Sequence, residues 1–375
     1  MLPPSLYIHI PWCLQKCPYC DFNSHAVKAT MPENQYIDTL LRDFAEDIAA
    51  YRINQPIETI FIGGGTPSLF SPSSINRLLS GINQQLNFAK NIEITLEANP
   101  GTFESQKFAE FRALGINRLS IGIQSFNDPM LKKLGRVHSS HEAILAAEIA
   151  HQAGFENFNL DLMYGLPDAN IELSKNDINT AISLLPKHIS LYQLSLEPNT
   201  YFYKFPPQLP SDELIFQTQL ACQEQLALHG FIQYEISAYS KAGYNCRHNI
   251  NYWQFGDYLG IGAGAHGKIT LTAPDQILRY AKPKSPEHYQ LQPTPETSVV
   301  ALADIPVEYL MNQLRLKSGF NLNAYQARTG LSSATLEPGL TACLKAGLLI
   351  ENAQHYHCSA KGWDFLDSIL AKFLP

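Results

Sequence analysis

The sequence predicts an α/β fold, in which a partial, open (β/α)6 barrel is followed by an α+β segment and a small winged-helix-like C-terminal domain. First, apolar strand-like segments alternate with amphipathic ones six times within 200 residues, at intervals of about 30 residues, which indicates a parallel sheet. Second, this alternation loses regularity near residue 200, whereas a closed eight-unit barrel needs about 250 residues. Third, short helical segments near the C-terminus precede two strand-like stretches. A doubly wound sheet is the alternative.

The six strand–helix units are defined by short apolar runs and by helical spacing of apolar residues. The expected strands are residues 6–10, 59–62, 92–96, 118–124, 158–163 and 189–196. The expected helices are residues 35–50, 75–86, 103–114, 141–153 and 174–185.

Three parts follow along the chain: residues 1–200 as the barrel core, 201–300 as the α+β extension and 301–375 as the C-terminal domain. The extension has a clear helix over 212–229 and ends in a Pro-, Gln- and Lys-rich stretch, 272–298, which predicts a linker or long loop. The C-terminal domain has sparse basic residues, which favours a structural or partner-docking role over DNA binding. Its expected elements are helices near 304–316, 321–329 and 333–346, a hairpin, and a last helix from Gly362.

Composition excludes several classes of protein. Lys and Arg number 27 against 34 Asp and Glu, and this net charge of −7 argues against nucleic acid as a partner. No apolar run approaches the roughly 20 residues of a membrane span, so we expect no stable membrane insertion. No basic region of a secretory signal follows Met1. We therefore expect a cytoplasmic protein, whose seven cysteines stay reduced rather than forming a disulfide framework.

Three of these cysteines are crowded together after the first strand. Cys13, Cys17 and Cys20 form a C-x3-C-x2-C pattern, at the end of a strand where such sheets bind ligands. Three thiolates without a fourth would leave one iron of a cubane cluster open, whereas structural zinc sites want four ligands. Spacing alone leaves three alternatives, namely an open iron–sulfur cluster, a zinc knuckle completed by His9 or His25, and chance.

Polar and glycine residues follow the next strands. The segment from Gly63 to Pro67, GGGTP, ends the second strand and lacks the GK[ST] ending of a phosphate loop, so an ordinary strand–helix turn is an alternative. Four polar residues, each explicable alone as a helix cap or solvated loop residue, would together line one mouth of the barrel. They are Glu97, Gln124, Arg136 and Asp161.

The cysteine pattern after a first strand is the signature of radical S-adenosylmethionine (SAM) enzymes. Residues 7–25, YIHIPWCLQKCPYCDFNSH, resemble the HemN/HemW family of coproporphyrinogen oxidase-like proteins, and the resemblance spans nearly the whole chain. It implies a [4Fe–4S] cluster held by Cys13, Cys17 and Cys20. It also implies that SAM binds the fourth iron through its amino and carboxylate groups. Transfer of an electron into SAM would then yield methionine and a 5′-deoxyadenosyl radical.

The same resemblance implies which residues contact SAM. The GGGTP segment contacts the methionine amino group, Arg136 suits a carboxylate, and Asp161 suits ribose hydroxyls. Tyr7 matches a tyrosine near the sulfonium, where an aromatic face attracts a cation. The full set that the resemblance implies is Tyr7, Tyr19, Gly64, Gly65, Thr66, Glu97, Gln124, Arg136 and Asp161.

Two departures distinguish this chain from the oxidase branch of the family. The oxidase carries a fourth cysteine two residues after the third, where this chain has Phe22. The oxidase also has a long extension before the first strand, which here begins at about Leu6. Both departures put porphyrinogen decarboxylation in doubt.

The segment from Cys246 to Trp253 contains H-N-x-x-Y-W and resembles the haem-binding signature of the chaperone branch. His248 offers an imidazole for haem iron, with Cys246 as an alternative thiolate, and Tyr252 and Trp253 offer flat apolar faces. The alternative from the residues alone is a core-packed aromatic pair with a histidine in a turn. The implied haem-binding residues are His248, Asn249, Tyr252 and Trp253.

We therefore expect a radical SAM-type haem chaperone that passes haem to haem-requiring proteins. The alternatives are an oxygen-independent coproporphyrinogen III oxidase and a haem carrier with a purely structural cluster. The resemblance implies [4Fe–4S], SAM and haem as cofactors. Its implied partners are haem-accepting apoproteins such as those of the respiratory chain, an electron donor for the cluster, and a second copy of the chain in a homodimer.

Overall fold

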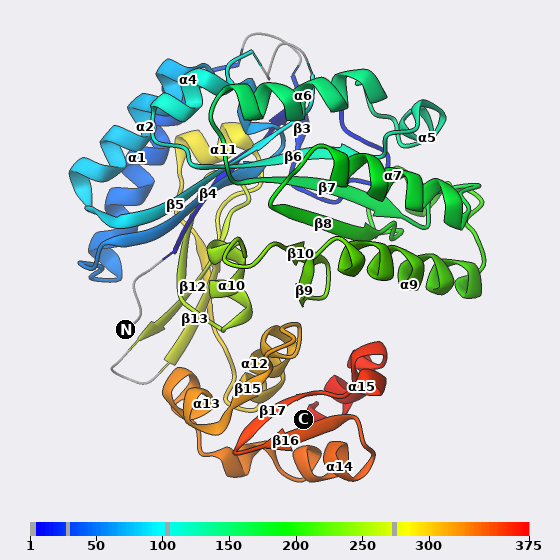
Figure 1. Cartoon of the computed structure of the whole chain (residues 1–375). Helices are drawn as coiled ribbons and strands as arrows, with labels where there is room; N and C mark the ends of the chain where they lie inside the picture. The colour runs from blue at the N-terminus through cyan, green and yellow to red at the C-terminus, as the bar shows by residue number, and fades with distance from the viewer. Residues whose placement is uncertain (1–4, 28–30, 102–105, 272–275, 375) are drawn as a thin grey trace.

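A computed structural model describes residues 5–27, 31–101, 106–271 and 276–374. A twelve-stranded sheet dominates it, with the strand order β14-β13-β12-β11-β1-β4-β5-β6-β7-β8-β10-β9 (Figure 1). The two edge strands of this order, β14 and β9, do not pair with each other in the described chain. The sheet therefore does not close, and the barrel is open as expected.

Six neighbouring strands run parallel in chain order, which confirms the partial (β/α)6 barrel. Their apolar residues, such as Leu6, Ile8 and Ile62, are fully buried, because helices cover the strands of a parallel sheet. The strands are β1 (Ser5–Ile10), β4 (Ile57–Gly64), β5 (Phe88–Ala98), β6 (Arg118–Gln124), β7 (Phe158–Tyr164) and β8 (His188–Gln193).

Several of the helices that connect these strands begin at side-chain caps. Ser139 caps α6 in a capping box with Glu142, and Ser71 and Asn170 cap α2 and α7. Part of the helix expected over 103–114, residues 103–105, lies outside the described residues. The connecting helices are α1 (Glu33–Ala50), η1 (Pro67–Leu69), α2 (Pro72–Gln85), α4 (Phe108–Ala113), α5 (Asp128–Lys133), α6 (Ser140–Gln152) and α7 (Ile171–Ser183).

The extension adds strands to both edges of this sheet. A strand that the sequence did not predict as part of the parallel set, β11 (Tyr258–Ile261), pairs parallel with β1. Antiparallel strands then continue from β11 on one edge and from β8 on the other. The further elements are α8 (Tyr201–Lys204), α9 (Asp212–Leu228), β9 (Ile232–Glu235), β10 (Ala238–Ser240), α10 (Arg247–Trp253) and β12 (His266–Leu271).

The prediction of a linker or long loop over residues 272–298 is wrong for the described residues, 276–298. They form β13 (Gln276–Ala281), α11 (Pro286–Leu291) and β14 (Glu296–Val299), which belong to the main sheet or pack beside α1. The fully buried Lys282 ammonium lies 2.5 Å from Asp43 and 2.8 Å from Asp47 of α1. The segment is therefore held by buried ionic contacts, which its polar composition conceals.

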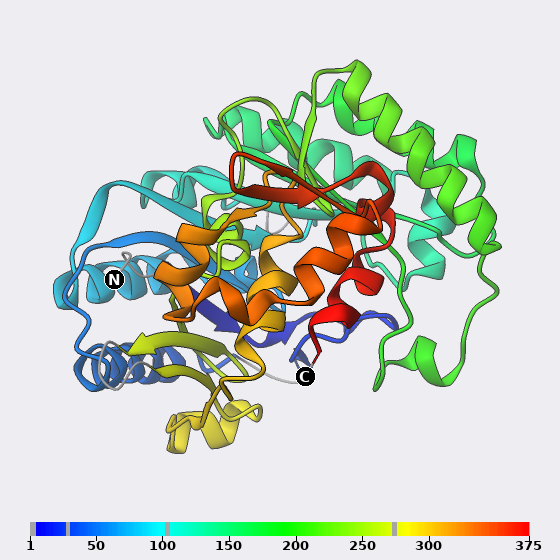
Figure 2. The same ribbon diagram turned by 90° about the horizontal axis from the view of Figure 1, so that it is seen from below.

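The C-terminal domain has its own apolar core, built around Tyr309, Phe320 and Tyr325. As expected, helices precede a hairpin, and the hairpin is completed into a three-stranded sheet in the order β15-β17-β16. Figure 1 shows this domain below the main sheet, and Figure 2 shows it in front when seen from below. Its elements are α12 (Ile305–Gln313), β15 (Phe320–Asn321), α13 (Leu322–Thr329), η2 (Ser333–Leu336), α14 (Gly339–Lys345), β16 (Leu349–Asn352), β17 (His355–Cys358), α15 (Ala360–Asp364), α16 (Leu366–Leu370) and η3 (Ala371–Phe373).

Within the described residues, none of the helices combines the length and apolar character needed to cross a membrane.

Candidate functional site

A cavity of about 370 Å³ opens at the carboxyl ends of the parallel strands. Its walls come from the cysteine loop and from the ends of β4 to β8, so the connections of the barrel bring together residues almost 200 positions apart. This is the end at which parallel α/β sheets bind ligands.

The cysteine loop is held at both of its ends. Cys13 ends β2 (Trp12–Cys13), which pairs with β3 (His25–Ala26). Within the loop, the amide of Cys20 donates to the carbonyl of Cys17 at 3.1 Å, and the amide of Phe202 in α8 donates to Pro18 at 2.9 Å. These bonds fix the backbone that carries the three thiols.

A zinc knuckle completed by His9 does not fit this arrangement. The ring nitrogens of His9 are both engaged, with the Tyr7 hydroxyl at 2.9 Å and the Asn23 carbonyl at 2.8 Å. In the described part of the chain, no three His, Cys, Asp or Glu side chains converge as they would on one metal ion. Three separated thiols on one loop instead suit a cluster in which each sulfur ligates a different iron.

The glycine segment packs directly against the cysteine-bearing strand. A Cβ on Gly65 would lie 2.4 Å from the carbonyl oxygen of Trp12, and one on Gly64 would lie 2.6 Å from the His9 ring. Gly64 also has φ +116°, which favours glycine. Glycine is therefore required here for close approach, and it exposes backbone to the cavity beside the thiols.

Two carboxyl groups border the inner part of the cavity. Glu97 accepts a hydrogen bond from the amide of Gly64 at 3.0 Å, and desolvation, followed by the nearby Asp161, raises the pKa of Glu97 to about 8. Asp161 accepts from Ser120 at 3.1 Å and from Asn159 at 2.8 Å, while burial raises its pKa as well. A bound cation would favour the ionised form of both groups.

Arg136 links the cysteine loop to the strand ends. Its Nη1 donates to Sγ of Cys17 at 3.5 Å, and its Nη2 donates to Asn99 at 2.7 Å and to the carbonyl of Gly122 at 2.8 Å. Its buried Nε has no hydrogen-bond partner among the residues that the structure describes. Arg136 can therefore offer a donor and a charge to an anionic group in the cavity.

The structure brings together every residue of the expected cluster and SAM set except Tyr7. Tyr7 contacts His9 and Phe61 inside the barrel and does not line the cavity. The residues that line it from this set are Cys13, Cys17, Tyr19, Cys20, Gly64, Gly65, Thr66, Glu97, Gln124, Arg136 and Asp161.

Sequence reasoning missed the part of the cavity wall formed by the end of β8 and the residues after it. Tyr192, Gln193, Ser195 and Glu197 line the cavity there. The strand-end rule that selected Glu97 and Asp161 could have found them, because they lie near the carboxyl end of β8 or just after it. Asn99, which lies two residues after Glu97, was also missed, and it donates to Thr66 at 3.0 Å.

The H-N-x-x-Y-W segment lies at the opposite end of the barrel, in α10. His248 is 1% exposed, and its ring nitrogens contact Thr59 at 2.9 Å and the Tyr252 hydroxyl at 2.7 Å. Glu93 accepts the amide of His248 at 3.0 Å. Both ring nitrogens of His248 therefore have hydrogen-bond partners within the protein, so an iron-ligand role would require one of these bonds to break.

The other members of that segment lie differently. Cys246 is fully buried, and burial raises the pKa of its thiol to about 12. Asn249 is half-buried. Tyr252 and Trp253 line a second, smaller cavity between α10, the β12–β13 hairpin and the C-terminal domain. The aromatic pair is therefore the part of the segment that lines a cavity.

Comparisons with known proteins agree with this arrangement. The family model "Radical SAM superfamily" matches residues 7–177, and "HemN C-terminal domain" matches residues 300–365. Proteins named "Heme chaperone HemW" from Haemophilus influenzae and Escherichia coli are each 47% identical over 100% of this chain and 98% and 99% of their own lengths. One from Bacillus subtilis is 35% identical and covers 93% of both chains. The structure of coproporphyrinogen III oxidase HemN from Escherichia coli matches with a TM-score of 0.82 at 21% identity, covering 99% of this chain and 90% of that chain, which shows a shared fold.

Proposed function

The chain belongs to the HemW family of radical SAM proteins, and from this membership we propose that it is a haem chaperone that carries haem to haem-requiring apoproteins. The observation that carries the proposal is 47% identity along the whole chain to relatives of that name. The proposed partners are haem, acceptor apoproteins including those of the respiratory chain, an electron donor, and a second copy of the chain.

The cavity of about 370 Å³ at the carboxyl ends of the parallel strands, the mouth cavity, fits the two cofactors that the family implies. Cys13, Cys17 and Cys20 would hold three irons of a [4Fe–4S] cluster, leaving the fourth for SAM. SAM carries a sulfonium, an ammonium and one carboxylate, so it has a net positive charge. The cavity is lined by four acidic side chains (Asp21, Glu97, Asp161 and Glu197) and two basic ones (Lys16 and Arg136). This balance of charge suits a cationic ligand. When bound, the two cofactors would supply one-electron chemistry.

Residues of this chain would orient the bound nucleotide. Arg136 would pair with the SAM carboxylate through its unpartnered Nε while its other nitrogens stay on Asn99 and Gly122. Glu97 and Asp161 would accept from the ammonium and from ribose hydroxyls. The exposed backbone of Gly64 and Gly65 would allow close approach. Tyr7 has no such role in this proposal, because it lies outside the cavity.

The oxidase alternative is disfavoured by the same charges. Coproporphyrinogen III carries four propionates, and only Lys16 and Arg136 supply positive charge among the described residues that line the cavity. Phe22, which is 57% exposed, also occupies the position of the extra oxidase cysteine. A carrier with a purely structural cluster is disfavoured too, because it would not need a cavity of about 370 Å³ lined by polar side chains beside the thiols.

For haem, we propose contact through Tyr252 and Trp253 at the second cavity. Asn249 lies beside them on α10. His248 would act as a positioning residue, since its 2.7 Å hydrogen bond holds the Tyr252 hydroxyl. The haem iron would then be bound by a group other than His248, because both ring nitrogens of His248 are hydrogen-bonded within the protein.

Haem transfer tests the function directly. Anaerobically reconstituted protein is titrated with haemin, and the loaded protein is mixed with a haem-free respiratory cytochrome b while the acceptor spectrum is followed. We expect one haem per chain and faster transfer than from haem-loaded serum albumin. Absence of stoichiometric haem binding, or transfer no faster than from albumin, would contradict the proposal.

A further inference from the structure

The second cavity lies where three parts of the chain meet. It has a volume of about 140 Å³ and combines aromatic walls with two basic side chains, Lys268 and Arg279, and one amide, Asn312. Pockets that enclose whole small-molecule ligands are about 300–1,000 Å³. This cavity therefore has room for one edge or substituent of a large ligand rather than for the whole of it. Its remaining lining residues are Tyr252, Trp253, Phe255, Gly256 and Tyr258.

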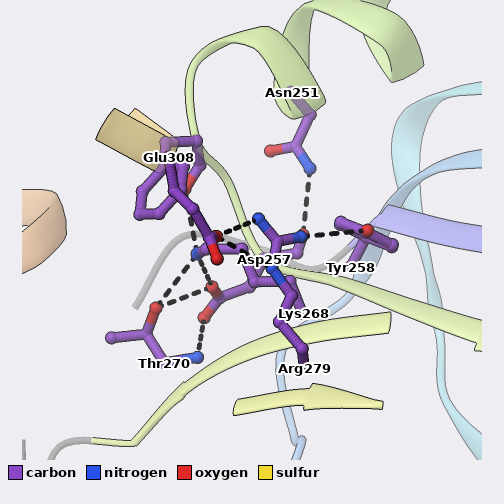
Figure 3. A network of polar contacts seen from close by, with 8 residues as sticks. Asn251, Asp257, Tyr258, Lys268, Thr270, Arg279 and Glu308 are labelled. Carbon is purple, nitrogen blue, oxygen red and sulfur yellow. Dashed lines mark hydrogen bonds and ion pairs between the residues drawn. The ribbon is translucent and has the colours of Figure 1, made fainter. Parts of the chain in front are cut away.

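The two basic side chains differ in how firmly they are held (Figure 3). Lys268 is buried and donates to Asp257 at 2.8 Å, to the carbonyl of Phe255 at 3.1 Å and to Thr270 at 3.2 Å. An ammonium has three protons to donate, so Lys268 is saturated by the protein. It closes the back of the cavity and has no donor left for a ligand.

Arg279, in contrast, is held mainly by the Glu308 carboxylate, which a ligand carboxylate could replace. Its Nε and Nη2 both donate to the single oxygen Oε2 of Glu308, at 3.1 and 2.7 Å, and its Nη1 donates to Tyr258 at a longer 3.3 Å. The Arg279 and Glu308 side chains are 30% and 24% exposed. The pair is thus partly open to solvent and uses only one oxygen of Glu308, so a carboxylate that enters the cavity can compete with Glu308 for the guanidinium.

The aromatic residues that line this cavity indicate what kind of molecule would carry such a carboxylate. Tyr252 and Tyr258 contact edge to face at 4.4 Å between ring centroids, and Trp253 completes this aromatic side. The buried Nε1 of Trp253 has no hydrogen-bond partner in the described chain, although buried indole N–H groups usually have one. A flat apolar ring would fit against this aromatic side of the cavity.

We propose that this cavity takes the carboxylate-bearing edge of a flat aromatic macrocycle, with Arg279 exchanging the Glu308 carboxylate for that of the ligand. The inference rests on the proposed haem function and specifies the haem propionates as the groups recognised. Glu308 and Asn312 both lie on α12, so the exchange releases a contact of the C-terminal domain with the sheet. The Glu308 carboxylate thus competes with the ligand for Arg279. The C-terminal domain, which carries Glu308, therefore regulates the site.

The test compares haemin with haem whose two propionates are methyl esters, by absorbance titration of the full-length protein. Arg279→Gln should weaken haemin binding roughly tenfold, the loss expected for one charge-assisted pair. Glu308→Gln should strengthen it, because the competing carboxylate is removed. The diester should bind the wild type more weakly than haemin does and should not distinguish the variants. Asp38→Asn, which removes the exposed ion pair with Arg77 between α1 and α2, is the matched control and should leave binding unchanged.

The outcomes separate this inference from the proposed function. Haemin binding that is unchanged in both Arg279→Gln and Glu308→Gln overturns the inference and leaves the haem function standing. Equal affinity of the wild type for haemin and the diester also overturns it. A wild type that binds neither compound contradicts the haem function itself, and the inference with it.

Discussion

The guanidinium of Arg136 donates to the thiol of Cys17 across 3.5 Å, although 119 residues separate the two in sequence. The same side chain contacts Asn99 after β5 and Gly122 in β6. One arginine therefore ties the proposed cluster loop to the strand ends that would hold the nucleotide.

Replacing Arg136 by Gln should weaken SAM binding by about tenfold, because a charge-assisted contact with the SAM carboxylate is lost. Equilibrium dialysis of the reconstituted protein with SAM measures the change. Arg112→Gln, on the exposed surface of α4, is the control. Undiminished SAM affinity in the Arg136 variant would show that the carboxylate binds elsewhere.

Cys13→Ala, Cys17→Ala and Cys20→Ala should each abolish the brown colour and most of the iron after anaerobic reconstitution. Cys222→Ala and Cys343→Ala should retain about four irons per chain, because both thiols are fully buried in apolar cores away from the cavity. Iron and sulfide analysis with absorbance spectra reports the result. A stable, colourless protein loaded with zinc would refute the cluster.

Glu97 should make the stability of the apoprotein depend on pH. Its pKa is raised to about 8 in the folded protein, so the folded state retains a proton that the unfolded state releases above about pH 4.5. Its contribution to stability is therefore complete below pH 4.5 and is lost as pH rises towards 8. Relative to the wild type, Glu97→Gln should gain about 2–3 kcal/mol in stability as pH rises from 5.5 to 7.5, measured by urea unfolding of the apoprotein. Glu172→Gln, at an exposed site, should show no such trend.

Lys282→Met should destabilise the protein by about 3–5 kcal/mol, since it leaves the buried Asp43 and Asp47 without a counter-charge. Adding Asp43→Asn should recover part of this loss. Chemical unfolding measures both. If Lys282→Met proved as stable as the wild type, the buried ion contacts would not be what holds the 276–299 segment in the sheet.

With SAM, a reductant and coproporphyrinogen III, the reconstituted protein should form no protoporphyrinogen. The physical reason is the shortage of basic side chains around a cavity that would have to accept four propionates. Chromatography of the oxidised porphyrins detects the product, with a coproporphyrinogen oxidase of the HemN type as the positive control. Sustained turnover would favour the oxidase.

Local patterns in the sequence were enough to predict the six barrel strands, their order and the strand-end positions of several residues that line the mouth cavity, such as Glu97 and Asp161. This is possible because apolar periodicity depends on near neighbours, and because the connections of a parallel sheet place all carboxyl ends on one side. The identity of Cys13, Cys17 and Cys20 as one group likewise follows from their closeness in the chain.

Contacts between distant residues decided the rest. The polar 276–299 segment joins the main sheet or packs beside α1 because Lys282 finds Asp43 and Asp47 more than 230 positions away, and no local pattern encodes that pairing. The same holds for His248, which a motif marks as a ligand but which Thr59 and Tyr252 engage in the packed barrel. A side chain's availability for a ligand depends on which partners the fold brings to it, so it emerges only when the tertiary structure is complete.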